Sequence, residues 1–237
     1  KGYKTNDIKQ YESNIWNYVC SDSIIDLEVN DSSLVALSED SLYFFNLKNP
    51  SSPVKRNQLP LPGGKGLQIS LFQNRLFIAA STGGLYTVDD ISSPENLSFG
   101  SISQFTTGNI TAAEVSPYIL AYHDRISNQI KIHRMGNGQF SSQIAAYFTE
   151  SDSVYDIALD DRNLYTAHRA GGVKAYNISN LSEIPSTLQP DTLLVPLPGE
   201  SYYKVYSSDG ILSIAAGKGG LKLYFNLFSG YVHEIQT

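Results

Sequence analysis

One strand-like segment recurs five times along this chain of 237 residues. Its copies are SLYFFNL (41–47), GLYTVDD (84–90), QIKIHRM (129–135), GVKAYNI (172–178) and GLKLYFNL (220–227), and their first apolar residues lie 43, 45, 43 and 48 residues apart. Helical solenoids have repeats of similar length, but these segments alternate with period two and are rich in Tyr, Phe and Ile. The repeat therefore predicts a series of small β-sheets.

Each repeat has room for three more short strands around this segment. The second-strand candidates precede it, as SLVALS (33–38), RLFIAAS (75–81), YILAYH (118–123), NLYTAH (163–168) and ILSIAAG (211–217). The first-strand candidates are IIDLEV (24–29), LQISLF (67–72), ITAAEV (110–115), VYDIAL (154–159) and YYKVYS (202–207). Less regular fourth strands follow at 54–59, 97–103, 140–148, 186–195 and 231–236. Together they predict an all-β fold, a β-propeller of about five four-stranded blades.

The segments AASTGGLYTVDDISSP (79–94) and AHRAGGVKAYNISN (167–180) combine an Ala-rich second strand, a Gly turn and an Asp/Asn-Ile-Ser turn. In this combination the chain resembles the LVIVD-repeat β-propeller family. The resemblance covers all but about the first twenty residues and weakens at 134–139 and 226–230. It implies an extracytoplasmic propeller that is often associated with the cell surface, and it carries no family catalytic residues.

The expected domain is a single propeller over residues 1–237, with repeats at approximately 22–63, 64–108, 109–151, 152–199 and 200–237. Residues 1–20 precede the first repeat, and the segment 7–19 contains apolar residues such as Ile8, Tyr11 and Trp16. This segment is expected to be a strand that closes the ring beside the fifth repeat, or the remnant of a preceding blade.

Charge and cysteine content narrow the function classes. The formal net charge is −6 and the 17 Lys and Arg residues are scattered, which argues against a nucleic-acid surface. No segment approaches the ~18 apolar residues that span a bilayer. Cys20 is the single cysteine, so neither an intrachain disulfide nor a thiolate metal cluster is expected. The chain opens at Lys1 without Met, which suits an exported protein whose signal or lipid-anchor segment precedes Lys1.

No motif in the sequence predicts catalysis. AAGKGG (215–220) resembles a phosphate-binding loop, but a strand follows it where a helix is needed, so it is interpreted as a hairpin turn. His123 and His168 occupy matching places in two repeats, yet no carboxylate recurs beside both, and they are interpreted as turn or surface residues. Catalytic residues, metal ligands and cofactors are therefore not assigned.

The first strands offer a better candidate site. When the second strands are aligned without gaps, Asp26, Gln68, Asp156 and Lys204 superpose, each within an apolar segment. First strands lie nearest the axis of a propeller, so these side chains are expected to form a polar ring in the central channel, as a structural lining or as ligand contacts. The third repeat offers Thr111 or Glu114 at this position, without a clear choice between them.

These observations favour a non-catalytic binding or assembly scaffold in the extracellular space or the cell envelope, whose loops are presented to a protein or glycan partner. The alternative is a metal-assisted hydrolase or lyase at the propeller axis, which would use Asp26, Asp156 and a histidine. Fold alone grants no activity, so the enzyme is the second hypothesis.

Overall fold

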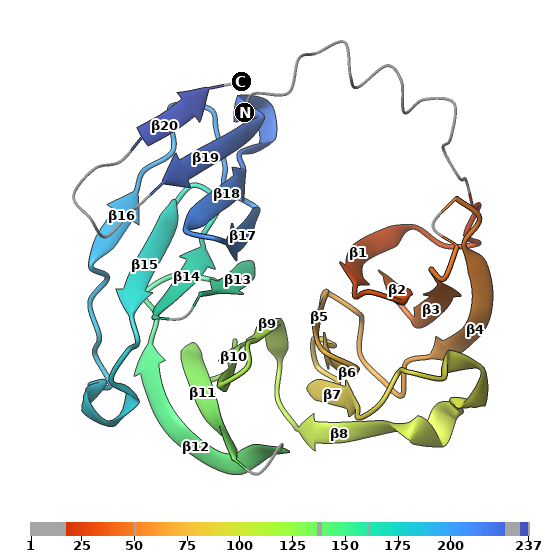
Figure 1. Ribbon diagram of the computed structural model, residues 1–237. Helices are drawn as coiled ribbons and strands as arrows, with labels where there is room; N and C mark the ends of the chain where they lie inside the picture. Colours follow the sequence, from red (N-terminus) through yellow and green to blue (C-terminus); the bar gives the residue numbers. More distant parts are fainter. Residues whose placement is uncertain (1–17, 50, 137–138, 161, 226–232, 237) are drawn as a thin grey trace.

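The computed structural model describes residues 18–49, 51–136, 139–160, 162–225 and 233–236. Five four-stranded antiparallel sheets follow one another in chain order as the blades of a five-blade β-propeller (Figure 1). The predicted all-β fold is thus confirmed. The closing strand or blade remnant predicted at the N-terminus lies largely outside the described residues, which begin at Tyr18.

Each blade runs outward from the axis in the order of its strands. Blade 1 contains β1 (Ile24–Val29), β2 (Ser33–Ser38), β3 (Ser41–Asn46) and β4 (Val54–Pro60). Blade 2 contains β5 (Gln68–Phe72), β6 (Arg75–Ala79), β7 (Leu85–Val88) and β8 (Ile102–Thr106). Blade 3 contains β9 (Ile110–Val115), β10 (Ile119–Asp124), β11 (Gln129–Gly136) and β12 (Gln139–Thr149). Blade 4 contains β13 (Asp156–Leu159), β14 (Asn163–Ala167), β15 (Val173–Asn177) and β16 (Thr192–Leu194). Blade 5 contains β17 (Lys204–Ser208), β18 (Ile211–Ala215), β19 (Leu221–Phe225) and β20 (His233–Gln236).

Two fourth strands differ from the sequence prediction. The expected strand at 186–195 shrinks to β16, because Pro190 has no amide hydrogen to give to a ladder. The segment predicted at 97–103 begins instead with the 3₁₀ helix η4 (Phe99–Ser101), where Ser98 and Ser101 cap one another, and β8 starts only at Ile102. In the described part of the chain, no helix is long and apolar enough to cross a bilayer.

Glycine turns join the second and third strands where the chain has to approach its own fourth strand. Gly84 and Gly172 have φ angles of 92° and 89°, a region that favours glycine. A Cβ at either position would meet the main-chain oxygen of Thr106 or Leu194, at 2.3 and 2.1 Å. The AAGKGG segment forms the corresponding turn of blade 5, with the short 3₁₀ helix η6 (Gly217–Gly219) leading into β19. The hairpin interpretation of this segment is confirmed.

The apolar core is divided among the blade interfaces. One buried cluster lies between blades 1 and 2, and others lie between blades 2 and 3, 3 and 4, and 4 and 5. Period-two alternation explains this division, because successive residues of a strand point to opposite faces of its sheet. Each inner blade therefore packs one face on the blade before it and the other on the blade after it.

Polar side chains on the first strands join neighbouring blades by hydrogen bonds to the main chain. Asp26 Oδ2 accepts from Ile69 N–H (2.9 Å between heavy atoms), Gln68 Oε1 accepts from Ala113 N–H (3.0 Å) and Asp156 Oδ2 accepts from Val205 N–H (2.8 Å). Between blades 3 and 4, the hydroxyl of Thr111 donates to Val154 O at 3.1 Å. We call these bonds the inter-blade latches. They satisfy buried main-chain groups that no strand ladder reaches.

Gln68→Ala should lower the free energy of unfolding by about 1–3 kcal/mol, because it leaves the buried Ala113 N–H without an acceptor. Gln143→Ala is the matched control, since Gln143 is exposed on β12 and its loss should cost no more than about 0.5 kcal/mol. Urea denaturation of both variants measures the difference. Equal stabilities would mean that the Gln68 latch contributes nothing to the ring.

Candidate functional site

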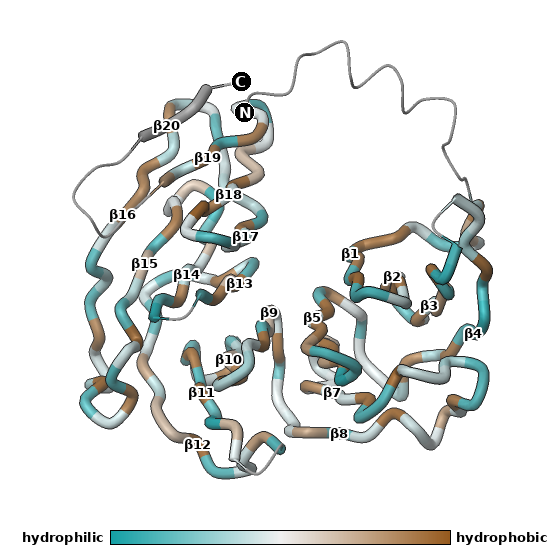
Figure 2. The backbone as a smooth tube through the Cα atoms, viewed as in Figure 1, coloured by the Kyte–Doolittle hydropathy of each residue, from teal (hydrophilic) through white to brown (hydrophobic). Residues whose placement is uncertain are grey.

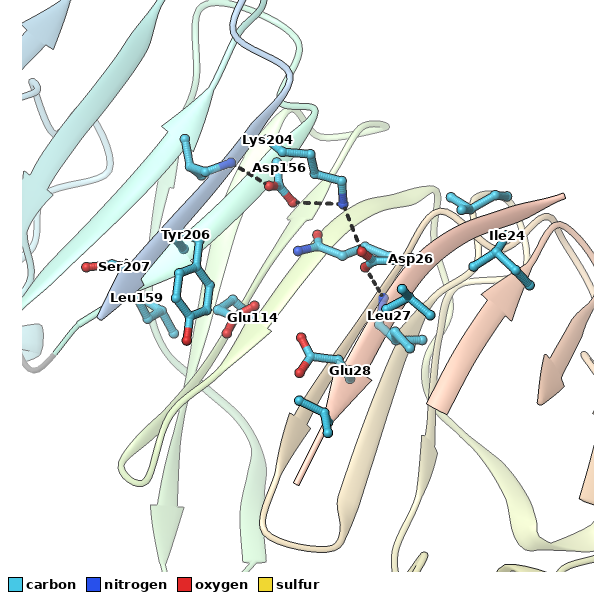
Figure 3. A pocket seen from close by; sticks show the side chains of 16 residues that line it. Ile24, Asp26, Leu27, Glu28, Glu114, Asp156, Leu159, Lys204, Tyr206 and Ser207 are labelled. Carbon is cyan, nitrogen blue, oxygen red and sulfur yellow. Dashed lines mark hydrogen bonds and ion pairs between the residues drawn. The ribbon is translucent and has the colours of Figure 1, made fainter. Parts of the chain in front are cut away.

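A cavity of about 640 Å³ opens at the axis, where the first strands of the blades converge. Its polar lining includes Asp26, Gln68, Asp156 and Lys204, the four residues that the sequence alignment superposes. Figure 3 shows Asp26 on β1 facing Asp156 and Lys204 on the opposite wall. The structure thus brings all four into one site.

The strand registers show why these residues coincide. Asp26 pairs with Leu37, Gln68 with Ala79, Asp156 with Ala167 and Lys204 with Ala215, so each lies opposite the same position of its second strand. In blade 3 the residue paired in this way is Ala112, opposite His123. The third blade therefore interrupts the polar ring, and neither Thr111 nor Glu114 takes this position.

Lys204 links three blades through ion pairs. Its Nζ lies 3.5 Å from Asp26 Oδ1 of blade 1 and 3.4 Å from Asp156 Oδ1 of blade 4. Burial lowers the pKa of Lys204, but Asp156 and Asp26 outweigh it, and the net pKa is raised. Burial raises the pKa of Asp156 to about 7, although the Lys204 charge and the Val205 N–H act in the opposite direction. The cation is therefore held firmly between two carboxyls of which one is easily protonated.

Two further acids line the cavity; the sequence analysis did not name Glu28, and it offered Glu114 only as an alternative to Thr111 for the ring position of the third repeat. Glu28 and Glu114 occupy equivalent positions, two residues beyond Asp26 and Ala112, and point into the space beside Tyr206 (Figure 3). Burial raises the pKa of Glu28 to about 7, and the negative charge of Asp26 adds to the effect. The pKa of Glu114 is raised well above its ordinary value by burial and by the charges of Glu28 and Asp156. The signal was the i, i+2 spacing of Asp26 and Glu28, which puts both on one face of a strand.

The remaining lining is apolar and accessible. Leu27, Val29 and Tyr206 line the cavity with 57%, 61% and 66% of their surfaces exposed. The site thus combines apolar contact area with four carboxyls and one lysine, and a molecule that enters it meets a surplus of acidic groups.

The histidines lie elsewhere. The interpretation of His123 and His168 as surface residues is wrong, because both are buried, as is His133; His123 lies within β10, while His168 does lie at the turn that follows β14. Their rings bond to Thr111, Thr166 and the Ser141 carbonyl oxygen, at 2.6, 2.7 and 2.7 Å. Burial lowers their pKa values, that of His168 to about 4, so they are neutral at pH 7. Among the described residues, no group of three or more His, Cys, Asp or Glu is arranged to hold a metal ion.

A second buried charge network lies between blades 3 and 4 and was not anticipated. The Glu150 carboxylate accepts from Lys174 Nζ at 2.8 Å and from the Tyr176 hydroxyl at 2.6 Å. Lys174 also lies 3.3 Å from Asp152 Oδ2. All of these donors are committed within the protein, so the network stabilises the interface and offers no free group for chemistry. Glu150 lies outside the repeated strands, so no repeat pattern pointed to it.

Lys204→Ala should destabilise the protein by about 1 kcal/mol at pH 8, because Asp26 and Asp156 then repel one another without a cation between them. The loss should shrink as the pH falls below about 7, where Asp156 takes up a proton. Lys218→Ala, an exposed lysine on η6, is the control. If both variants unfold alike at pH 8, the bridge has no energetic role.

Glu28→Gln should make the protein more stable than its parent, and the gain should increase with pH. The folded pKa of Glu28 is about 7 against about 4.5 for an ordinary glutamate, so the parent loses stability as the pH rises from about 4.5 to about 7. The amide has no proton to lose. The difference in melting temperature between variant and parent should therefore widen over this range and level off above it; a constant difference would contradict the assignment.

Comparisons with known proteins support the β-propeller fold and give no information on function. No protein-family model matches the chain, and no curated protein sequence matches it. Among solved structures, the chain is similar to the crystal structure of the computationally designed Ika8 protein, with a TM-score of 0.57 and 14% sequence identity. The match covers 90% of this chain and spans 62% of the length of the designed one. At this identity the likeness concerns the fold alone.

Proposed function

We propose that this propeller is a non-catalytic binding or assembly module of the LVIVD-repeat kind, acting at the cell surface or in the envelope. Its partner is a protein that places a basic side chain, flanked by apolar residues, in the axial cavity. The observation that carries this proposal is the lining of the cavity, where exposed Leu27, Val29 and Tyr206 surround the carboxyls of Glu28 and Glu114.

The lining matches such a segment in two respects. Aromatic and aliphatic side chains that are accessible in a concave site make the free energy of binding more favourable when a partner removes them from water. The cavity favours a cation most strongly above pH 7, because Glu28 and Asp156, each with a pKa of about 7, become negatively charged as the pH rises through neutrality. A glycan could use the same acids as hydrogen-bond acceptors, but Leu27 and Val29 suit an aliphatic side chain better.

The alternative of a metal-assisted hydrolase or lyase receives less support from the geometry. It needs Asp26, Asp156 and a histidine together, yet both aspartates accept a main-chain N–H of the next blade and pair with Lys204. His123, His133 and His168, the histidines whose side chains the structure describes, do not line the cavity. A carboxylate that holds two blades together is poorly placed to move during catalysis.

The cell-surface location and the family rest on the repeat motif. The turn that the motif describes is present in blades 2 and 4, where Ala80 N–H bonds to Gly84 O and His168 N–H bonds to Gly172 O. This equivalence supports the repeat, and the family resemblance in turn supports an extracytoplasmic module.

Short peptides with a central Arg between leucines should bind the protein, while the same peptides with a central Glu should not. At pH 8, where Glu28 is ionised, Glu28→Gln should weaken binding of the basic peptide about tenfold, the loss of one charge-assisted contact of roughly 1.4 kcal/mol. Binding should strengthen from pH 6 to pH 8 as Glu28 ionises. Isothermal titration calorimetry measures all three effects.

Asp31→Asn is the matched control, because it removes the same charge from an exposed loop between β1 and β2. Equal weakening by the control would show a general charge effect and not a site. Binding of oligosaccharides, with no binding of either peptide, would replace the protein partner by a glycan.

A further inference from the structure

A second opening lies between blades 2 and 3, apart from the axial cavity. It consists of an outer cleft of about 580 Å³ and an inner recess of about 170 Å³, whose linings share Arg75, Asp89 and Phe140. Neither part shares a lining residue with the axial cavity. Figure 2 shows both hydrophobic and hydrophilic residues along β11 and β12, the outer strands of blade 3, which contribute Met135 and Phe140 to the outer part. We call the two parts together the blade 2–3 cleft.

The inner recess has the size and lining of a site for one aromatic ring. Phe77 packs edge-on against Phe105 and Phe140, with 5.8 and 5.4 Å between ring centroids, and all three rings line the recess. Its volume is close to that of an apolar cavity of about 150 Å³, which is large enough to hold benzene. A six-membered ring therefore fits here, where it can meet the phenylalanines in the edge-to-face arrangement that aromatic pairs prefer.

One polar side chain of the recess is unusual among the five blades. Thr87 is 8% exposed, and its hydroxyl has no hydrogen-bond partner among the described residues. Thr87 pairs with Phe77, and the residues at the equivalent places of the other third strands are all apolar, namely Phe44, Ile132, Ala175 and Leu223. A buried hydroxyl without a partner costs stability, and the other blades show that the fold does not require one here. A ligand that supplied the missing hydrogen bond would remove this cost.

The charged side chains at the mouth of the recess compensate one another. Arg75 Nε lies 3.3 Å from Asp89 Oδ1, and the Arg75 side chain is only 20% exposed. Because this pair carries no net charge, the recess favours a neutral ring over a charged group. The outer part of the cleft is more polar, with Gln73, Asn74 and Asp90 in its lining, and it suits the remaining groups of a small molecule.

We propose that the blade 2–3 cleft binds a small phenol, whose ring occupies the inner recess and whose hydroxyl bonds to Thr87. A phenol hydroxyl both donates and accepts, as does the hydroxyl of threonine, so either group can supply the proton. The Arg75 guanidinium at the mouth of the recess adds attraction for the face of an electron-rich ring. The site is separate from the axial cavity, so the inference stands whether or not that cavity binds a basic segment.

Para-cresol and toluene test the proposal, because they differ by a single hydroxyl and are both neutral at pH 7. In an NMR titration of the ¹⁵N-labelled protein, para-cresol should shift the amide signals of Thr87 and Phe140. It should bind about tenfold more tightly than toluene, which leaves the Thr87 hydroxyl unpaired. Thr87→Val should abolish this preference and raise the melting temperature, since the other blades have apolar residues at this place. Thr149→Val, at the exposed end of β12, is the matched control and should change neither.

Equal affinities of the parent protein for para-cresol and toluene, or no binding of either, would overturn the proposal without any variant. Signals that shift only at the axial strands, around Asp26 and Lys204, would place the ring in the other cavity and would also refute it. A blocked tripeptide with a central Tyr that binds while free para-cresol does not would refute the small molecule in favour of a side chain of a partner protein. The Arg-containing peptide should not displace para-cresol, because the two sites share no lining residue; displacement would contradict a separate site.

Discussion

The ring depends on one recurring interaction, the bond from a first-strand side chain to the main chain of the next blade. Apolar clusters hold neighbouring blades together, but apolar contact is non-directional and would tolerate sliding of one sheet over the next. The bond from Ile69 N–H to Asp26, and its counterparts at Gln68 and Asp156, fix the blades in a single register. The angle between blades, and with it the axial cavity, follows from these bonds.

The same interaction explains why the axis is acidic. An acceptor that reaches a buried N–H has to be polar and close to the axis, and a carboxylate is the strongest such acceptor. Asp26 and Asp156 meet this need, and Lys204 offsets their charge. Glu28 and Glu114 are not latches in the described structure, and their raised pKa values show that they are held at a cost to stability. Groups retained at such a cost in an accessible cavity are the best candidates for contact with a partner.

Much of the fold was predictable because the repeat spacing and the period-two alternation report the same strands. The alignment of Asp26, Gln68, Asp156 and Lys204 was accessible for the same reason, since three of the four second strands lead to similar turns. The place of Ala112 in this alignment could not be predicted, because blade 3 has no glycine turn and its β9–β10 pairing shifts register at His123. His133 packs against Phe105 of blade 2, and His168 and Lys174 of blade 4 face Glu150 at the end of blade 3; such contacts between blades are encoded by no single repeat. Irregular fourth strands were hardest to place, because local proline and 3₁₀ geometry decide their ends.

The inter-blade latch also bears on how such a ring can change in evolution. In the latches of Asp26, Gln68 and Asp156 the donor is a main-chain N–H, which every residue except proline supplies, so the receiving strand needs no particular side chain. A duplicated blade therefore carries its own acceptor side chain, and the main chain of the neighbouring blade supplies the N–H donor. Asp26, Gln68 and Asp156 occupy equivalent latch positions here, while the equivalent residue is an alanine, Ala112, in blade 3 and a cation, Lys204, in blade 5. Repeats joined in this way can diverge almost freely in sequence, which accounts for a chain whose internal kinship is visible mainly in its spacing.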